Sequence, residues 1–430
     1  MALVSRANAQ VIPTGEEMFL IPPWNAHAIF EPTALPQLSG ESVAPEDMPV
    51  RDRAWPEYQA RGIRAGAWMF NPTLTAGAGY DSNVFSSPND QQGDLLEHLG
   101  AGLSANSLWE RHGISMGLST GSIFYQNHPT LNETDATFGA GGHFDIDHST
   151  QILGTFNAGY LHTEVGSLTS PLGAIKPTPY SSISGDLALK KQFGRVTTTV
   201  GAAVSSYDFG STVAQNGTII NQDALDGQIY IAHARIDYAF SEKLAVFTAT
   251  ESNWRELRGT PEQSLESNGY RALAGFNLEL THLIKGEFAA GYMRQHFFAS
   301  SIGNIEGPAY RAVVNWSPSR LVDVHFKAEQ IVTESFDLGS TGIRADAVQT
   351  GIDYEFRPNV VLLTAATYEK DHFQGQPRED NVYAVDARIK YALNNLMSIS
   401  LGYRYTLRDS NVTAASFDKH QVAVNASAHF

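Results

Sequence analysis

The chain has 430 residues, a formal net charge of -16 and no cysteine. The acidic balance argues against a nucleic-acid partner, because neutralising phosphates requires a basic face, and the absence of cysteine excludes thiol catalysis and cysteine-ligated metal. No apolar run approaches the roughly 20 residues that a membrane-spanning helix needs.

The N-terminus carries the features of an export signal. Ala7-Asn8-Ala9 before Gln10 fits the small-x-small pattern that signal peptidase cleaves, and a short apolar run precedes it. We expect residues 1–9 to be the remnant of a signal peptide and the mature chain to start near Gln10. A chance match in an ordinary N-terminus is the alternative.

Residues 10–62 are predicted to form a proline-rich extended arm. Eight of the chain's 19 prolines lie here, and proline cannot donate to a sheet ladder. The one apolar cluster of this arm, at residues 18–24, could dock on the strands predicted after it or on a partner. It could also belong to a loosely ordered leader. We expect the arm to be periplasmic, provided that the number of strands after it is even.

A distinctive segment joins this arm to the first predicted strand. Its first part is Pro56-Glu57-Tyr58 with Gly62-Ile63-Arg64 and Gly66, and its second part is Gly79-Tyr80-Asp81 with Asn83-Val84-Phe85. The segment resembles the opening of the putative β-barrel porin 2 family, which is common in alphaproteobacteria. The resemblance implies an outer-membrane barrel, often encoded near surface-polysaccharide genes.

Residues 63–430 repeat one unit, namely an alternating strand, a polar loop, a second alternating strand and a tight turn. The tight turns are predicted at 110–113, 147–150, 192–195, 240–243, 281–283, 317–320, 356–359 and 392–395. The longer loops are predicted at 85–93, 126–133, 164–177, 210–222, 256–268, 299–307, 335–342, 371–379 and 408–416. The predicted fold is therefore all-β, a transmembrane antiparallel up-and-down barrel of about 18 strands, with 16 as the alternative. A soluble propeller would need blade signatures, and the sequence shows none.

Aromatic residues gather at the ends of the predicted strands. This distribution is typical of side chains at the two membrane interfaces, whereas a soluble sheet would scatter them through its core. The predicted aromatic girdle consists of Trp109, Tyr238, Trp254, Tyr270, Tyr292, Tyr310, Trp316 and Tyr391.

Charged residues of the predicted strands fall on the face opposite the apolar one, which predicts a wet lumen. The predicted luminal acids are Asp186, Asp237, Glu251, Glu279, Glu287, Asp323, Glu329, Asp353, Glu355 and Asp386. The predicted luminal bases are Lys190, Arg235, Arg255, Arg271, Lys285, Arg311, Lys327, Arg388, Lys390 and Arg404. The two sets balance, as in a general porin rather than in an arginine-lined conduit for an anionic polymer. Cross-strand pairing inside a plugged barrel is the alternative.

The last stretch alternates in the same way and ends on an aromatic residue. Val422 and Val424 fall on one face and Gln421 and Asn425 on the other, up to the terminal Phe430. This stretch resembles the last strand of Gram-negative outer-membrane barrels, whose terminal aromatic is read by the barrel-assembly machinery. We expect it to pair with the first strand near residues 66–80, with Phe430 as the assembly signal.

The sequence favours no catalytic or metal site. His143, Asp145 and Asp147 share a strand face, but residues two apart on a strand are about 7 Å apart, which is too far to ligate one ion without a neighbouring strand. We therefore expect no enzymatic activity, no cofactor and no metal. Acids of the long loops, among them Asp94, Asp371 and Asp380, are expected at an exposed rim among lipopolysaccharide phosphates, with divalent cations between the like charges.

The leading functional hypothesis is a porin-like channel of the Gram-negative outer membrane, through which small hydrophilic solutes pass passively. Export of an exopolysaccharide is the alternative, and it rests on the family resemblance. A plugged structural barrel whose arm tethers a periplasmic partner is the third hypothesis. The expected partners are outer-membrane lipid, lipopolysaccharide and the barrel-assembly machinery, with no nucleic acid. The sequence specifies neither the solute nor the oligomeric state.

Overall fold

The structure is a computed structural model. It describes residues 50, 55, 57–167, 170–259, 264–281, 283–299, 303–333 and 342–430. The predicted signal-peptide remnant and residues 10–49 of the predicted arm lie outside the described residues.

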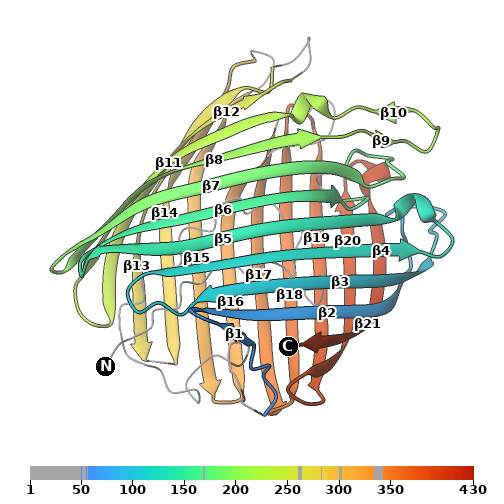
Figure 1. Cartoon of the computed structure of the whole chain (residues 1–430). Helices are drawn as coiled ribbons and strands as arrows, with labels where there is room; N and C mark the ends of the chain where they lie inside the picture. Colours follow the sequence, from blue (N-terminus) through green and yellow to red (C-terminus); the bar gives the residue numbers. More distant parts are fainter. Residues whose placement is uncertain are drawn as a thin grey trace.

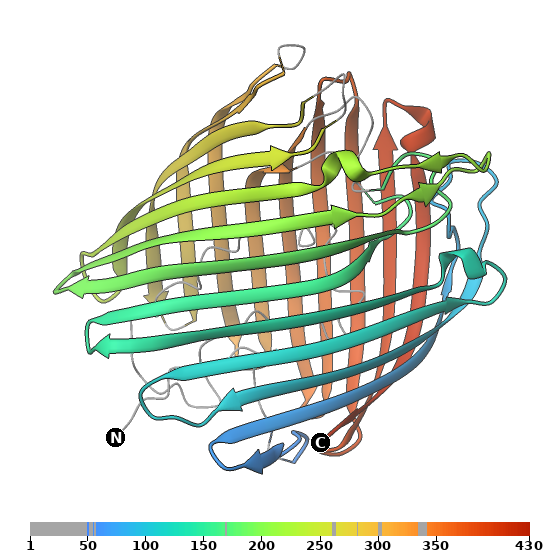
Figure 2. The same cartoon turned by 45° about the horizontal axis from the view of Figure 1, so that its top comes forward.

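The described strands form one closed antiparallel barrel of 18 strands, which confirms the predicted fold class and the larger of the two strand counts (Figures 1 and 2). The strands are β2 (Trp68–Asp81), β3 (Asp94–Ser107), β4 (Gly113–Tyr125), β5 (Glu133–Asp147), β6 (Thr150–Thr163), β7 (Thr178–Phe193), β8 (Val196–Phe209), β11 (Gly227–Ala239), β12 (Leu244–Leu257), β13 (Ser267–Thr281), β14 (Ile284–Phe297), β15 (Ile305–Ser319), β16 (Val322–Thr333), β17 (Gly342–Arg357), β18 (Val360–Gln374), β19 (Glu379–Ala392), β20 (Met397–Ser410) and β21 (Phe417–His429). Each strand pairs with its neighbours in the chain, so the connections alternate between the two ends of the barrel.

The barrel closes where its first strand meets its last. β21 pairs with β2 from Thr73 opposite His429 to Asp81 opposite Gln421, and with β20 on its other side. The predicted pairing of the terminal stretch is therefore correct. Because every strand has two partners, the wall has no free sheet edge along this seam.

A short strand completes the seam at the end with the tight turns. β1 (Ile63–Ala65) pairs with residues 68–70 of β2, just beyond the place where β21 ends. Pro72 lies in the gap between these two pairings. Its carbonyl oxygen accepts a hydrogen bond from the backbone N–H of Phe430 at 3.0 Å.

The remaining elements belong to the longer loops. They are β9 (Thr212–Val213) paired with β10 (Ile219–Ile220), and the 3-10 turns η4 (Pro129–Leu131), η5 (Asp223–Leu225) and η6 (Thr413–Ala415). Among the described residues no helix is long and apolar enough to cross a membrane.

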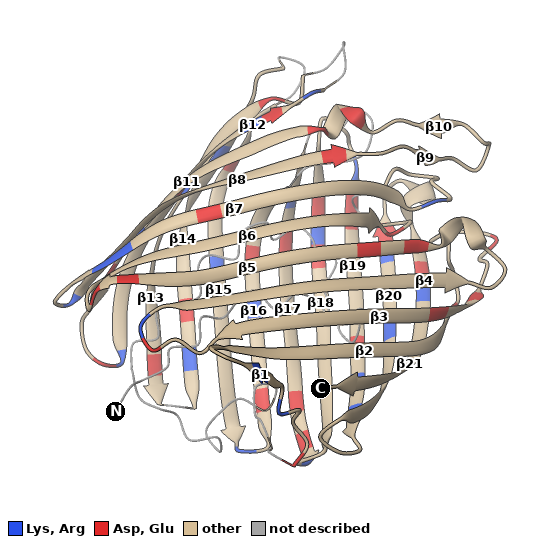
Figure 3. Ribbon diagram, viewed as in Figure 1, with Lys and Arg blue, Asp and Glu red and all other residues tan. Residues whose placement is uncertain are grey.

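The two faces of the wall differ in chemistry. On β12, Val246 and Trp254 are exposed on the outside, while Phe247 and Asn253 on the alternate positions are buried on the inside. On β19, Val385 is likewise exposed. Apolar side chains therefore cover the outer surface, as the lipid-facing band of a membrane barrel requires. Figure 3 shows that charged residues gather on the later strands, β11 to β20, and are sparse along β2 to β4.

The residues of the predicted girdle on the strands occupy outer positions, whereas Trp109 lies in the turn between β3 and β4. Trp109, Tyr238, Trp254, Tyr270, Tyr292, Trp316 and Tyr391 are exposed. Tyr310 is half-buried, and its hydroxyl donates to Asp346 Oδ1 on β17 at 3.0 Å.

Candidate functional site

The charged residues predicted to face the lumen occupy the inner positions of their strands. Glu251 and Arg255 share the alternation of buried Asn253 on β12, and Arg388 shares that of buried Asp386 on β19. The other predicted luminal residues, from Asp186 on β7 to Arg404 on β20, follow the same alternation. The inner wall therefore carries both signs of charge over more than half of its circumference.

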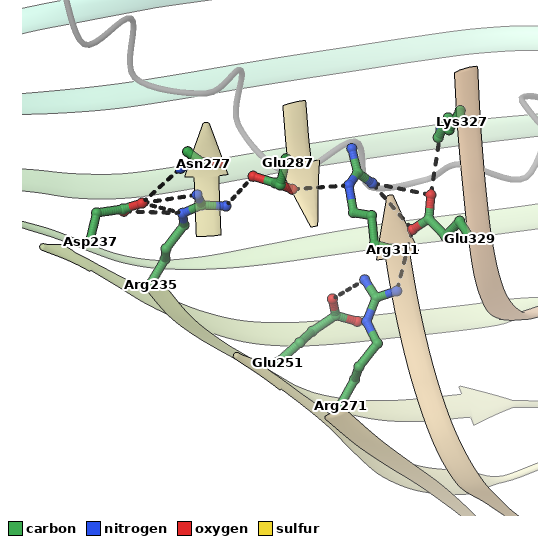
Figure 4. Close-up of polar contacts among 9 residues, drawn as sticks. All are labelled: Arg235, Asp237, Glu251, Arg271, Asn277, Glu287, Arg311, Lys327 and Glu329. Carbon is green, nitrogen blue, oxygen red and sulfur yellow. Dashed lines mark hydrogen bonds and ion pairs between the residues drawn. The ribbon is translucent and has the colours of Figure 1, made fainter. Parts of the chain in front are cut away.

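Five of these residues form a chain of ion pairs along the inner wall (Figure 4). The Arg235 guanidinium donates to both carboxylate oxygens of Asp237, with Nε 3.0 Å from each, and also reaches Glu287 Oε2 at 3.1 Å. Glu287 then pairs with Arg311 Nε at 3.3 Å. Arg311 in turn donates from Nη1 to Glu329, at 3.2 Å and 3.1 Å from its two oxygens. The carboxylates are almost fully buried, so each one requires this partner.

Three more residues join this chain at Glu329 (Figure 4). Arg271 Nη1 lies 3.4 Å from Glu329 Oε1, and its Nη2 lies 3.3 Å from Glu251 Oε2. Lys327 Nζ lies 3.5 Å from Glu329 Oε2. We call these eight residues the luminal network. They are Arg235, Asp237, Glu251, Arg271, Glu287, Arg311, Lys327 and Glu329. Four cations face four carboxylates, so the luminal network has no formal net charge.

Small residues on the inner wall leave room for the long side chains of the luminal network. Phe247, Gly275, Ala289 and Arg311 lie opposite one another in a row across β12 to β15. A Cβ atom on Gly275 would lie 2.8 Å from the Phe247 ring, so only glycine lets this ring lie against the wall. The Arg235 guanidinium stacks on the same ring, 3.7 Å from its centroid, and is thereby held toward Asp237 and Glu287.

Other predicted luminal residues form pairs outside the luminal network. Glu279 lies opposite Lys285 at 3.3 Å, and Arg404 lies opposite Asp386 and donates to it at 2.5 Å. Asp186 Oδ2 accepts a hydrogen bond from Nε2 of His233 at 2.8 Å, and no sequence pattern singled out this histidine. Asp353 lies 3.4 Å from His325, and Arg255 donates to the Val332 carbonyl at 3.4 Å. Further predicted luminal residues that occupy inner positions of their strands are Lys190, Glu355, Arg388 and Lys390. Opposite charges facing across adjacent strands are therefore the common rule of this wall.

The expectation of an exposed acidic rim is wrong for three residues. Asp94, Asp371 and Asp380 are almost completely buried. Asp371 lies in β18, which extends to Gln374 through positions predicted as loop, while Asp94 and Asp380 lie at the starts of β3 and β19, on inner positions of these strands. Asp380 accepts from Arg378 Nε at 3.0 Å, while Asp94 accepts from the backbone and side chain of Asn127. Asp371 and Phe373 follow the alternation of inner positions on β18. Gly375 and Pro377, which follow them, are typical of loops and favoured the loop prediction for this stretch.

The segment that resembles the porin family holds the seam together. Asp81, at the end of β2, accepts from Gln421 Nε2 at 2.9 Å and from the Asn83 backbone at 2.8 Å. The Asn83 side chain donates to the carbonyl of Asp418 at 3.0 Å. Buried Lys419 reaches Asp81 Oδ2 at 3.5 Å and Glu164 Oε1 at 2.6 Å, which ties the β6–β7 loop to the seam. These contacts give the segment a structural role.

No metal centre is found within the described part of the chain, since no group of three His, Cys, Asp or Glu side chains there could hold an ion. His143 lies 3.8 Å from Asp145, whereas Asp147 accepts hydrogen bonds from Ser149 and Thr150. The three residues therefore do not converge.

Solved structures that match the chain include proteins of Pseudomonas and Acinetobacter. A BenF-like porin from Pseudomonas fluorescens Pf-5 is 12% identical, with a TM-score of 0.45, and the match covers 84% of this chain and 99% of that one. OccAB3 from Acinetobacter baumannii is 10% identical, with a TM-score of 0.45 and the same coverages of 84% and 99%. Pseudomonas aeruginosa OpdL is 14% identical, with a TM-score of 0.44 and coverages of 85% and 100%.

No curated protein matches the sequence. The family model of Putative beta-barrel porin 2 matches residues 55–430, which include the seam segment and the whole barrel. The closed wall, its apolar outer face and its charged inner face agree with this match. The chain therefore belongs to the Putative beta-barrel porin 2 family, a family of porin-like channels, and its place is the outer membrane of a Gram-negative bacterium.

Proposed function

We propose that small hydrophilic solutes cross the outer membrane passively through the lumen, past the luminal network. The observation that carries this proposal is the balance of that network, in which four cations and four carboxylates line one side of the wall. Opposed fixed charges offer hydrogen-bond donors and acceptors to a polar solute without attracting either sign strongly. The channel is therefore expected to be only weakly selective.

The same observation weighs against export of an anionic polysaccharide. An anionic polymer needs a run of cationic side chains that it can contact. In the luminal network Arg235, Arg271 and Arg311 each contact two carboxylates, so their charge is already matched.

Swelling of proteoliposomes in neutral sugars of increasing size tests the proposed passage. We expect rapid swelling with monosaccharides and slower swelling as the sugar grows, because the lumen sieves by size. Liposomes that contain the folded barrel and swell no faster than empty ones would rule out passive passage.

Glu329→Gln is expected to make the channel more selective for anions. The substitution removes the carboxylate that Arg271, Arg311 and Lys327 share, so the surrounding wall becomes net positive. A unit charge several ångströms from the solute path changes the anion-to-cation permeability ratio on the order of 2- to 5-fold at an effective dielectric constant between those of water and protein. The reversal potential across a salt gradient in a planar bilayer measures this ratio.

Glu306→Gln is the matched control for this selectivity change. Glu306 lies on the outer face of β15 and pairs there with Arg294 at 3.5 Å, so the same change of charge occurs away from the lumen. We expect its reversal potential to equal that of the wild type. If Glu329→Gln and Glu306→Gln shift the potential equally, the luminal network does not border the solute path.

A further inference from the structure

Three buried carboxyl groups lie together on the inner wall, where β18 and β19 approach the turn that joins them. Glu369 and Asp371 occupy inner positions two residues apart on β18, and Asp380 lies directly opposite Asp371 on β19. Their exposed fractions are 2%, 0% and 0%. Removing a carboxylate from water is costly unless cations or hydrogen-bond donors surround it, so each of the three groups needs a partner.

Two buried arginines supply cations to this site. Arg378 donates from Nε to Asp380 Oδ1 at 3.0 Å, and Arg408 Nε lies 3.8 Å from Asp380 Oδ2. Aromatic rings hold both guanidinium groups in place, since that of Arg378 lies 4.1 Å from the ring centroid of Phe373 and that of Arg408 lies 5.0 Å from that of Phe417. Both cations therefore contact Asp380.

Asp371 lacks such a partner. No N–H or O–H group of the described chain donates a hydrogen bond to either of its carboxylate oxygens. The residues opposite Asp371 and Glu369 on β17 are Ala345 and Ala347, which have no polar side-chain atom to offer. The group within hydrogen-bonding reach of Asp371 is the carboxyl group of Glu369. Two carboxylates are acceptors only, so a hydrogen bond between them requires a proton on one of them.

The charges around this pair lead to the same requirement. The charged groups that face it are Arg378 from the β18–β19 turn, Asp380 from β19 and Arg408 from β20, whereas β17 contributes alanines. Three carboxylates therefore face two guanidinium groups. The fully ionised cluster would carry one unmatched negative charge in a buried site, and a single proton removes it.

We propose that Glu369 and Asp371 bind one proton between them in the folded barrel. Two carboxyl groups in contact share a proton because like charges cannot both ionise at close range. The proton is the ligand of this site, and it completes the contacts that hold the β18–β19 turn against the inner wall. None of these residues belongs to the luminal network, so the inference does not depend on the passage of solutes.

Infrared spectroscopy of the folded barrel tests for the proton directly. At neutral pH we expect the carbonyl stretch of protonated carboxyl groups, and this band should lose the intensity of one group in Asp371→Asn and equally in Glu369→Gln. Asp409→Asn is the matched control, because Asp409 is exposed on β20, and it should keep the wild-type intensity. A wild-type barrel without the band, or equal intensity in the wild type and both amide variants, would overturn the proposal.

Unfolding in urea distinguishes one shared proton from none or two. Each amide variant leaves two carboxylates for two arginines, so Asp371→Asn and Glu369→Gln should unfold close to the wild-type urea concentration at neutral pH. The double variant leaves one buried guanidinium group unmatched, and its midpoint should fall by several times the sum of the two single shifts. Heat-modifiable migration measures the folded fraction. A double variant whose shift equals that sum would contradict the shared proton.

Discussion

Deleting Phe430 is expected to remove most of the folded barrel from the outer membrane. The residue ends the seam, since its backbone N–H bonds to the Pro72 carbonyl at 3.0 Å and its ring is exposed on the outer face. The lost hydrogen bond is worth only about 1 kcal/mol. The larger loss is the terminal aromatic that the barrel-assembly machinery is expected to recognise. Heat-modifiable migration of the protein in membrane fractions measures the folded amount.

The variants at this position separate recognition from stability. Phe430→Lys should behave like the deletion, whereas Phe430→Tyr should assemble normally. In detergent all three should fold to a similar extent, because the pairing of β21 with β2 between Thr73 and Asp81 does not involve Phe430. If Phe430→Lys reached the membrane at wild-type levels, the assembly role of this residue would be wrong.

Asp81→Ala is expected to destabilise the folded barrel by about 3–5 kcal/mol, the usual cost of breaking a buried ion pair from one side. Lys419 is only 5% exposed, and the substitution leaves it with Glu164 as its partner among the contacts described above. The Gln421 amide and the Asn83 backbone lose their acceptor at the same time. The free energy of unfolding in urea, followed by heat-modifiable migration, measures the effect.

The double variant Asp81→Ala with Lys419→Met checks the cause of this loss. Removing both charges should recover part of the free energy of unfolding, because no buried charge is then left without its partner. Asp418→Ala is the control, since its side chain contacts Gln91 at the exposed surface. A double variant less stable than Asp81→Ala alone would show that the ion pair is not the source of the effect.

The sequence predicts the wall of this barrel well, because strand alternation and turn residues are local signals. The terminal stretch around Val422 and Val424 indicated both its outer face and its pairing with the first strand, and the register confirms the pairing. The luminal network could not be predicted residue by residue. Glu329 contacts Arg271, which lies three strands away in the wall, and the length and direction of long side chains decide such contacts.

The misplaced acids show where local signals fail. Asp371 and Asp380 flank a glycine- and proline-containing turn, and in sequence this composition looks the same as a long exposed loop. Asp380 pairs with Arg378, whose guanidinium stacks on Phe373, 4.1 Å from the ring centroid, and neither contact can be read from the local sequence. The hydrogen bond from the Val50 backbone N–H to Asp323 also has no signal in the sequence, since it depends on a backbone donor rather than on a side chain.

Single-channel recording in planar bilayers tests the central claim most directly, with the full chain, Glu329→Gln and Glu306→Gln measured side by side. Porin-like passage past the luminal network predicts discrete conducting steps and a reversal potential that moves toward anion selectivity in Glu329→Gln. Folded, heat-modifiable protein that stays silent in the bilayer would contradict it.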